Sequence, residues 1–311
     1  MWKLVFGALG LVLALLGPIG FVRRFVRKIG IWAVAASIAY LAVWILRHGH
    51  LHQLWHAGGH GGSFWLGVDL VIALTVSWVP LVADYTRFAR SPRSAFAGAG
   101  LGYLLPTLFQ FGFGAVLVLS HPAIVGPTDV LTTVAAGGVG SVLALLALTV
   151  DETDEAFANI YSTAVSMQNF FPRASQRLLI VGVALLATGI SLGVDLTQYQ
   201  QFLLLLGAFF VPLFGVLLAD WLVAGRHYSR ERIFYGPAWQ PGMIASWLVG
   251  FALYEWIAQT QGLGFWTRWL AQLHPLSGGV GASLPGFAVS FVLGLAVALA
   301  AQARRAEHAP A

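Results

Sequence analysis

The chain has 311 residues, of which 58% are hydrophobic and only 9% are charged. A soluble domain carries about 25% charged residues, so this composition excludes a soluble fold and indicates that the solvent is lipid. The absence of cysteine excludes disulfides and thiolate metal sites. The formal charge of +5 comes from basic residues in short loops, so we interpret it as a topology signal rather than a nucleic-acid surface.

Apolar runs long enough to cross a hydrocarbon core of about 30 Å follow one another along the chain. The runs are continuous rather than alternating, so they predict α-helices and not the strands of a β-barrel. We expect one all-α integral membrane transporter domain over residues 1–311, with about nine transmembrane helices. The expected spans are 3–22, 30–47, 64–88, 94–120, 138–170, 177–194, 198–224, 242–261 and 284–303.

The first, third, fifth, seventh and ninth of these spans are each followed by basic residues. Together these loops hold 14 of the 17 lysines and arginines. Because short cytoplasmic loops are enriched in Lys and Arg, the pattern places the N-terminus outside and the C-terminus in the cytoplasm of a bacterial-type inner membrane.

The loop after the second span contains His48, His50, His52, His56 and His60, which are five of the nine histidines. The loop is rich in glycine and has no carboxylate or thiol to complete a ligand set. We therefore expect no specific metal site and no cofactor.

The third span contains Ser77, Trp78 and Pro80. Because proline lacks an N–H group and clashes one turn back, the helix is expected to break near residues 76–78. A helix broken inside the membrane frees carbonyl groups for a ligand or an ion, and the Trp78 indole can stack on a planar ring. The alternative is a plain kink beside a core tryptophan. Asp84 and Arg87, three residues apart, are expected to form a local structural pair.

The fifth span has the densest set of polar groups. On a helix, Glu152, Ala156, Asn159, Thr163 and Ser166 share one face, and polar residues inside spans are candidates for function. Asn159 can donate to and accept from a ligand. Thr153 and Asp154 offer hard oxygen atoms for Na⁺, or a carboxylate for a proton. The alternative is a solvated helix end.

The seventh span contains Pro212 and Gly215, which fit either a hinge or gate helix or an ordinary kinked span. In the eighth span, the lone carboxylate of Glu255 is expected to reach the membrane interface.

With these motifs in view, the chain resembles the nucleobase–cation symporter family one, in its branch of cytosine permeases and hydroxymethylpyrimidine transporters. Three stretches carry the resemblance: Ser77–Phe88 with its Trp-Val-Pro-Leu-Val-Ala-Asp sequence, Thr153–Ser162, and Phe202–Asp220. The turn at residues 15–24 is also similar to the connection between helices four and five of the family.

The resemblance implies a twelve-helix fold of two inverted five-helix repeats, the LeuT-like fold. The nine spans then correspond to helices 4–12, without the first three. Residues 3–47 end the first repeat, 64–224 form the second, and 242–303 form two C-terminal helices.

The resemblance also implies roles for individual residues. Trp78 is expected to stack on the base, with Ser77 and Asn159 bonding to it. The Val150 carbonyl, Thr153 and Asp154 are expected to line the site of the coupling cation, either Na⁺ or H⁺. Pro80, Asp84, Arg87, Pro212 and Gly215 are expected to have structural or gating roles.

The leading hypothesis is therefore a secondary active transporter, not an enzyme, that imports a pyrimidine-type base such as hydroxymethylpyrimidine or cytosine. Its expected partners are the small heterocyclic substrate and membrane lipid, with no nucleic acid and no protein partner. One alternative is a truncated inactive carrier or a miscalled gene start. Another is a membrane-embedded metal enzyme using Asp151, Glu152, Asp154 and Glu155, although such enzymes need two facing acidic motifs and the sequence has one.

Overall fold

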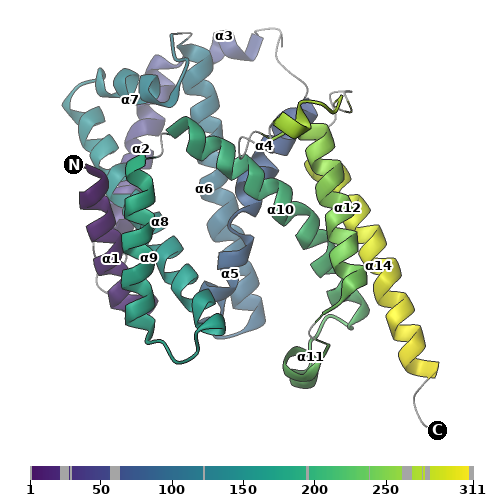
Figure 1. Ribbon diagram of the computed structural model, residues 1–311. Helices are drawn as coiled ribbons and strands as arrows, with labels where there is room; N and C mark the ends of the chain where they lie inside the picture. Colours follow the sequence, from purple (N-terminus) through teal and green to yellow (C-terminus); the bar gives the residue numbers. More distant parts are fainter. Residues whose placement is uncertain are drawn as a thin grey trace. The chain divides into compact units, whose positions relative to one another are not determined.

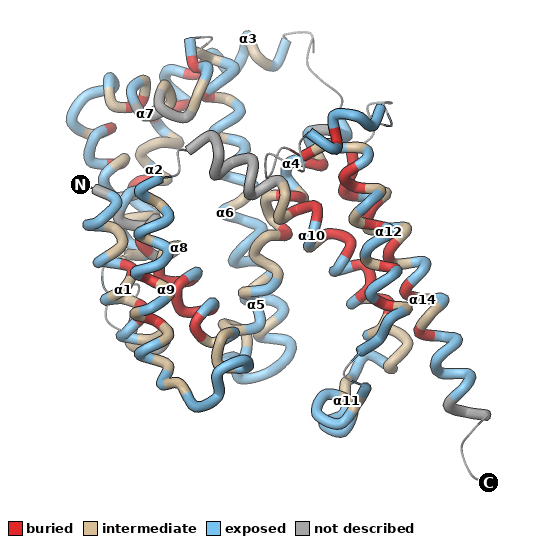
Figure 2. Tube along the Cα trace, in the orientation of Figure 1, coloured by how far each residue is buried: buried red, intermediate tan, exposed pale blue. Residues whose placement is uncertain are grey.

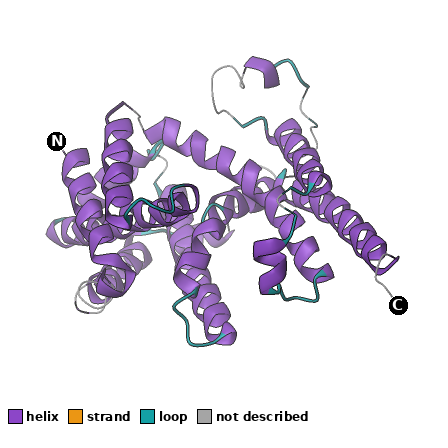
Figure 3. Ribbon diagram, turned by 60° about the horizontal axis from the view of Figure 1, so that its bottom comes forward, coloured by secondary structure: helices purple, strands orange, loops and turns teal. Residues whose placement is uncertain are grey.

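The computed structural model describes residues 2–21, 28, 30–56, 64–121, 123–193, 196–237, 239–260, 268–274, 276 and 281–307. Helices and loops make up this described part of the chain (Figure 3). The long helices are α1 (Trp2–Phe21), α2 (Ile31–His48), α4 (Phe64–Val76), α5 (Val79–Thr86), α6 (Pro92–Ser120), α8 (Val139–Phe170), α9 (Gln176–Gly193), α10 (Leu196–Val223), α12 (Pro241–Ala258) and α14 (Ser283–Glu307). The short helices are α3 (Leu51–His56), α7 (Pro127–Ala135) and α11 (Arg230–Tyr235).

Helices occur at all nine ranges where apolar runs predicted spans, which confirms the expected all-α membrane fold. By length and hydropathy, α2, α6, α9, α10 and α14 are each able to cross a membrane, and the bent pair α4–α5 makes a sixth candidate within the described residues. Their outward faces are strongly apolar: on α6, Phe96 is 85% exposed and Leu119 is 65% exposed. Such surfaces are stable in lipid and not in water.

The chain divides into two compact units, each described here by itself. The first comprises residues 1–59 and 81–193, and the second comprises residues 60–80 and 194–311. The boundary at residues 80 and 81 therefore falls near the start of α5. Helices α4 and α5 are labelled in Figure 1.

In the first unit α8 is the central helix, in contact with α1, α2, α7 and α9. Small residues let the helices approach closely: a Cβ atom built on Gly10 of α1 would lie 3.1 Å from the Ala156 Cβ of α8. A second core forms where α2 meets α6 and α7. Its buried members are Trp44, Ile45, Leu117, Ile124 and Val134.

In the second unit α10 packs against α14, α12 and α4. Buried residues follow α10 and α12 in this unit (Figure 2). At Gly250 of α12, an added Cβ would lie 2.7 Å from the Gly286 carbonyl of α14, and the Ser290 hydroxyl donates to the Ser246 carbonyl at 3.1 Å. Close backbone approach and a hydroxyl bond across helices are the usual means of packing in a bilayer.

Candidate functional site

The break in the third span occurs where Pro80 predicted it. Helix α4 ends at Val76, the turn contains Ser77 and Trp78, and α5 begins at Val79 with a bend of 43°. Pro80 is the second residue of α5, where its missing N–H group costs nothing to the new helix.

The turn redistributes the backbone hydrogen bonds. The Trp78 N–H donates to the Thr75 carbonyl at 3.2 Å rather than one residue further back, and the Ser77 hydroxyl donates to the Leu74 carbonyl at 2.7 Å. The regular helical donor to the Val76 carbonyl would be the N–H of residue 80, which proline lacks. Pro80 therefore removes the regular helical partner of the Val76 carbonyl, two residues before the half-buried Trp78.

Helix α4 is fixed within the second unit at two points. A Cβ atom on Gly207 of α10 would lie 2.7 Å from the Cβ of buried Ala73, so the two backbones are in close contact. Near the other end, the buried carboxylate of Asp69 accepts from the Ser283 N–H at 2.5 Å and so caps the start of α14.

Helix α5 is fixed within the first unit by polar contacts with α8. The Ser162 hydroxyl donates to the Asp84 carboxylate, and the Arg87 guanidinium donates to the Tyr161 hydroxyl at 2.8 Å. The expected local pair between Asp84 and Arg87 was wrong: these two described side chains form no ion pair, because each reaches a partner on α8 instead.

The polar face expected on α8 is open. Asn159, Thr163 and Ser166 are exposed, whereas the opposite face is buried through residues such as Phe157 and Tyr161. The Asn159 amide donates to the Glu155 carbonyl of its own helix at 3.1 Å. These groups can therefore meet a ligand without first breaking a contact with another helix of the unit.

The expected cation ligands are only partly described. Thr153 is buried, with 3% of its surface exposed. The backbone of α8 includes Val150 and Asp154, but their side chains lie outside the described residues, as do those of Asp151 and Glu152. Ser77 and Trp78 belong to the second unit, and Asn159 and Thr153 to the first, so the roles of these residues in one site stay predictions.

Pro212 and Gly215 lie in the tightly packed part of α10. Pro212 is fully buried, and a Cβ atom on Gly215 would lie 2.7 Å from the Phe287 carbonyl of α14. A hinge or gate role for these residues stays a prediction, whereas their part in the packing of α10 follows from the burial and the distance given above.

The burial of two carboxylates in the second unit, those of Asp69 and Glu255, was not predicted from the sequence. Asp69 was not considered, although a lone carboxylate in an apolar helix is a signal of function or of a buried partner. Glu255 was expected to reach the interface, but it is 1% exposed and accepts from the Thr260 hydroxyl at 2.6 Å. That prediction was wrong because the carboxylate is buried and bonded to Thr260, two residues after the end of α12.

The histidine-rich segment holds local contacts. His48 bonds within its own helix, where its Nδ1 lies 2.9 Å from the Trp44 carbonyl oxygen. The ring of His52 lies against the ring of His56. His60 lies outside the described residues. Among the residues that are described, no group of three or more metal-ligating side chains comes together.

An apolar depression of about 400 Å³ lies between α2, α3 and α6, lined by residues such as Ile45, Leu108 and Phe113. Its lining is aliphatic and aromatic, with no side-chain donor for a nucleobase. Binding sites for polar heterocycles need a few well-placed polar groups, so this depression fits a lipid-facing groove and not a substrate site.

Comparison with protein families matches residues 2–281 to the family described as permease for cytosine/purines, uracil, thiamine, allantoin. Comparison with curated proteins and with solved structures gave no significant match. The family match covers most of the chain, including α4, α5 and α8, and it confirms the resemblance at the level of the family. The chain therefore belongs to this permease family, and it is a multi-pass membrane transporter of nucleobase-like substrates rather than an enzyme.

Proposed function

We propose that the chain is a secondary active transporter that imports a pyrimidine-type base, hydroxymethylpyrimidine or cytosine, together with Na⁺ or H⁺. The observation that carries the proposal is the broken α4–α5 span, whose turn contains Ser77 and Trp78. Interrupted helices at this depth bind substrates and coupling ions in secondary transporters.

In this proposal the base stacks on Trp78. An indole offers a flat apolar face to a planar ring, and a stacked base contributes about 1–3 kcal/mol to affinity. Ser77 supplies a hydroxyl or its carbonyl to the ring edge, and Asn159 of α8 supplies an amide that both donates and accepts.

The coupling cation is proposed to bind at α8, to the Val150 carbonyl, Thr153 and Asp154. Hydroxyl, carbonyl and carboxylate oxygens suit a hard cation such as Na⁺, whereas the carboxylate alone suits a proton. The two coupling modes make different predictions for Asp154→Asn. Proton-driven uptake would be lost, whereas Na⁺-driven uptake would persist with weaker Na⁺ affinity, because the amide oxygen remains a ligand.

The way in which the two halves of the broken span are held supports alternating access. Helix α4 is anchored to α10 and α14, whereas α5 is anchored to α8. A ligand that binds one state of the transporter more tightly than the other shifts the equilibrium between outward and inward states by that difference in binding free energy.

The proposal is tested by uptake of labelled cytosine and hydroxymethylpyrimidine into proteoliposomes under a Na⁺ gradient or a pH gradient. Trp78→Ala is expected to abolish stacking and reduce base affinity by about fivefold or more, the equivalent of about 1–3 kcal/mol. The matched control is Trp65→Ala, because Trp65 lies on α4, the helix before the turn, with 49% of its surface exposed. Unchanged uptake by Trp78→Ala would refute the site, and no uptake of either base by the unmodified chain under either gradient would refute the transport activity proposed here.

A further inference from the structure

The connector between α10 and α12, residues 224–240, must lie at a bilayer surface. It begins one residue after Val223, the end of an apolar span, and it ends where Pro241 starts α12. Within it, α11 covers Arg230–Tyr235, and its start is capped by the Ser229 hydroxyl, which accepts from the Arg232 N–H at 3.2 Å.

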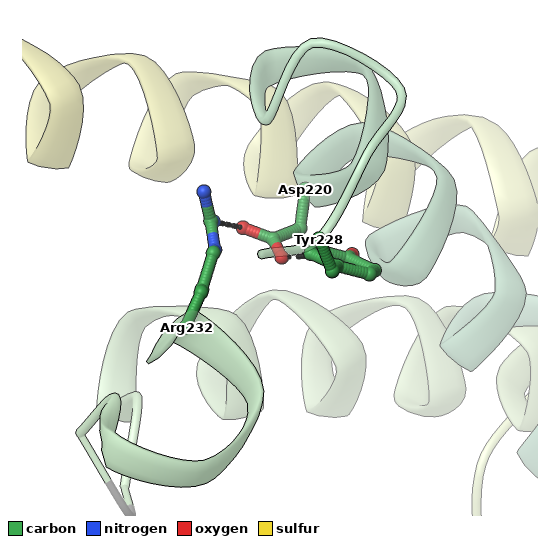
Figure 4. A network of polar contacts seen from close by, with 3 residues as sticks. All are labelled: Asp220, Tyr228 and Arg232. Atoms are coloured by element: carbon green, nitrogen blue, oxygen red, sulfur yellow. Dashed lines mark hydrogen bonds and ion pairs between the residues drawn. The ribbon is translucent and has the colours of Figure 1, made fainter. Parts of the chain in front are cut away.

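A polar clasp made of Asp220, Tyr228 and Arg232 holds α11 against the end of α10 (Figure 4). Asp220 of α10 accepts from the Arg232 guanidinium at 2.7 Å and from the Tyr228 hydroxyl at 2.9 Å. The guanidinium also lies 5.5 Å from the centre of the Tyr228 ring. Burial and the bond to Asp220 raise the pKa of Tyr228 to about 12, so the phenol stays a neutral donor at physiological pH. The connector therefore has a defined placement on its own unit.

The clasp leaves the apolar side chains of the connector uncovered. Ile233 is 61% exposed, Phe234 is 69%, Tyr235 is 85% and Trp239 is 77%. Four large apolar side chains within seven residues form a surface that is unfavourable in water. Tyr and Trp are the residues enriched at membrane interfaces, where the ring lies in the acyl boundary and the polar atom meets the headgroups.

Two arginines beside these side chains carry unneutralised charge. The charge of Arg232 is matched by Asp220, whereas the exposed Arg226 and Arg230 form no ion pair with any described residue. The Arg230 guanidinium lies 5.9 Å from the centre of the Phe234 ring, so one cation stands directly over the apolar surface. A guanidinium binds phosphate oxygens in bidentate geometry, which fits the headgroups of anionic lipids.

We infer that this surface of the connector, formed by Arg226, Arg230, Ile233, Phe234, Tyr235 and Trp239, binds the interface of an anionic bilayer. The arginines bond to lipid phosphates while the apolar side chains insert at the acyl boundary. The occupant is lipid because the connector begins directly after α10, an apolar helix long enough to cross a membrane, and so starts at the bilayer surface. Combined basic and aromatic side chains are the pattern that binds anionic interfaces.

The absence of cysteine in the chain makes the test direct, because a single introduced cysteine can carry a nitroxide label. Phe234→Cys, labelled and reconstituted, is compared in liposomes of phosphatidylcholine alone and in liposomes containing one quarter phosphatidylglycerol. The depth of the label is measured from its collision rates with oxygen and with a water-soluble nickel chelate. We expect the label to lie at the acyl boundary and to be more strongly shielded from nickel when phosphatidylglycerol is present.

Arg226→Gln with Arg230→Gln in the labelled background should remove this dependence on lipid charge, because each arginine near an anionic surface strengthens binding about fivefold. The matched control is Arg90→Gln with Arg93→Gln, which removes two exposed arginines around the start of α6. A label freely accessible to nickel in both liposomes would overturn the inference and favour a water-soluble protein partner. A label shielded from both oxygen and the nickel chelate would place the side chain against protein, which would also overturn the inference. A label depth that does not depend on lipid charge would remove the role of the arginines and would overturn it too.

Discussion

The contact between Gly207 and Ala73 sets the distance between α10 and the first half of the broken span, and Gly207→Ala tests it. The added Cβ atom would lie 2.7 Å from the Ala73 Cβ, 3.0 Å from its Cα and 3.2 Å from its carbonyl oxygen. Carbon atoms pack favourably at about 3.5–4.0 Å, so α4 must move by roughly 1 Å to relieve the overlap.

The expected cost follows from two opposing terms. Overpacking in a dense core costs about 1–3 kcal/mol. Replacing glycine by alanine inside a helix stabilises the folded state by about 0.5–1 kcal/mol. The net destabilisation is therefore about 1 kcal/mol, which for a chain of this size lowers the thermal midpoint by roughly 2 °C. Because α4 ends at the turn carrying Trp78, base affinity should weaken as well.

The assay is thermal unfolding of the purified protein, with and without base. Gly182→Ala is the matched control, because it also lies inside a helix but an added Cβ meets nothing within 4 Å. That variant should gain stability or leave it unchanged. Adding Ala73→Gly to Gly207→Ala removes the shortest overlap and should recover part of the loss. If Gly207→Ala stabilises the protein as much as Gly182→Ala does, the close approach of α4 and α10 is refuted.

Three further changes test other contacts. Tyr161→Phe removes the hydroxyl on α8 that accepts the Arg87 bond and should lower the free energy of unfolding by about 1 kcal/mol. A double-mutant cycle with Arg87→Gln, read from unfolding midpoints, measures the coupling between the two side chains. Additive losses of stability would show that the bond contributes nothing. Asp69→Ala should cost about 1–2 kcal/mol by uncapping α14, and Asp69→Asn should cost less because it keeps an acceptor for the Ser283 N–H; equal midpoints for the two variants would contradict the cap. The pKa of Tyr228 is raised from 10 to about 12 in the folded protein. Between pH 10 and about pH 12 the phenol of the unfolded chain is therefore deprotonated while that of the folded chain is not, so stability falls as pH rises. Tyr228→Phe should flatten this dependence of the unfolding midpoint on pH over the same range.

The helices and the break in the third span were predictable from the sequence, because both depend on local chemistry. A continuous apolar run has one stable backbone arrangement in lipid, so residues 283–307 form a helix close to the predicted range 284–303. Pro80 likewise acts through its missing N–H group and its own ring, so the break at residues 77 and 78 needs no knowledge of the rest of the fold.

The partners of polar side chains were not predictable, because they depend on which helices meet. Spacing favoured a pair between Asp84 and Arg87, but α8 supplies Ser162 and Tyr161 as nearer partners. Tertiary contacts therefore replaced the expected local pair. Glu255 was expected at the interface because its place near a helix end does not reveal its burial or its bond to Thr260.

The same contrast between local chemistry and tertiary contacts applies to the turn at Ser77 and Trp78. Local chemistry breaks the helix there, while tertiary contacts hold the two halves separately: Asp69 and Ala73 of α4 contact α14 and α10, and α5 contacts α8. A kink serving only packing would need no such separate anchoring, since one neighbouring helix could hold both halves. The tertiary contacts of each half therefore lie within its own compact unit, whereas the break itself follows from Pro80 alone.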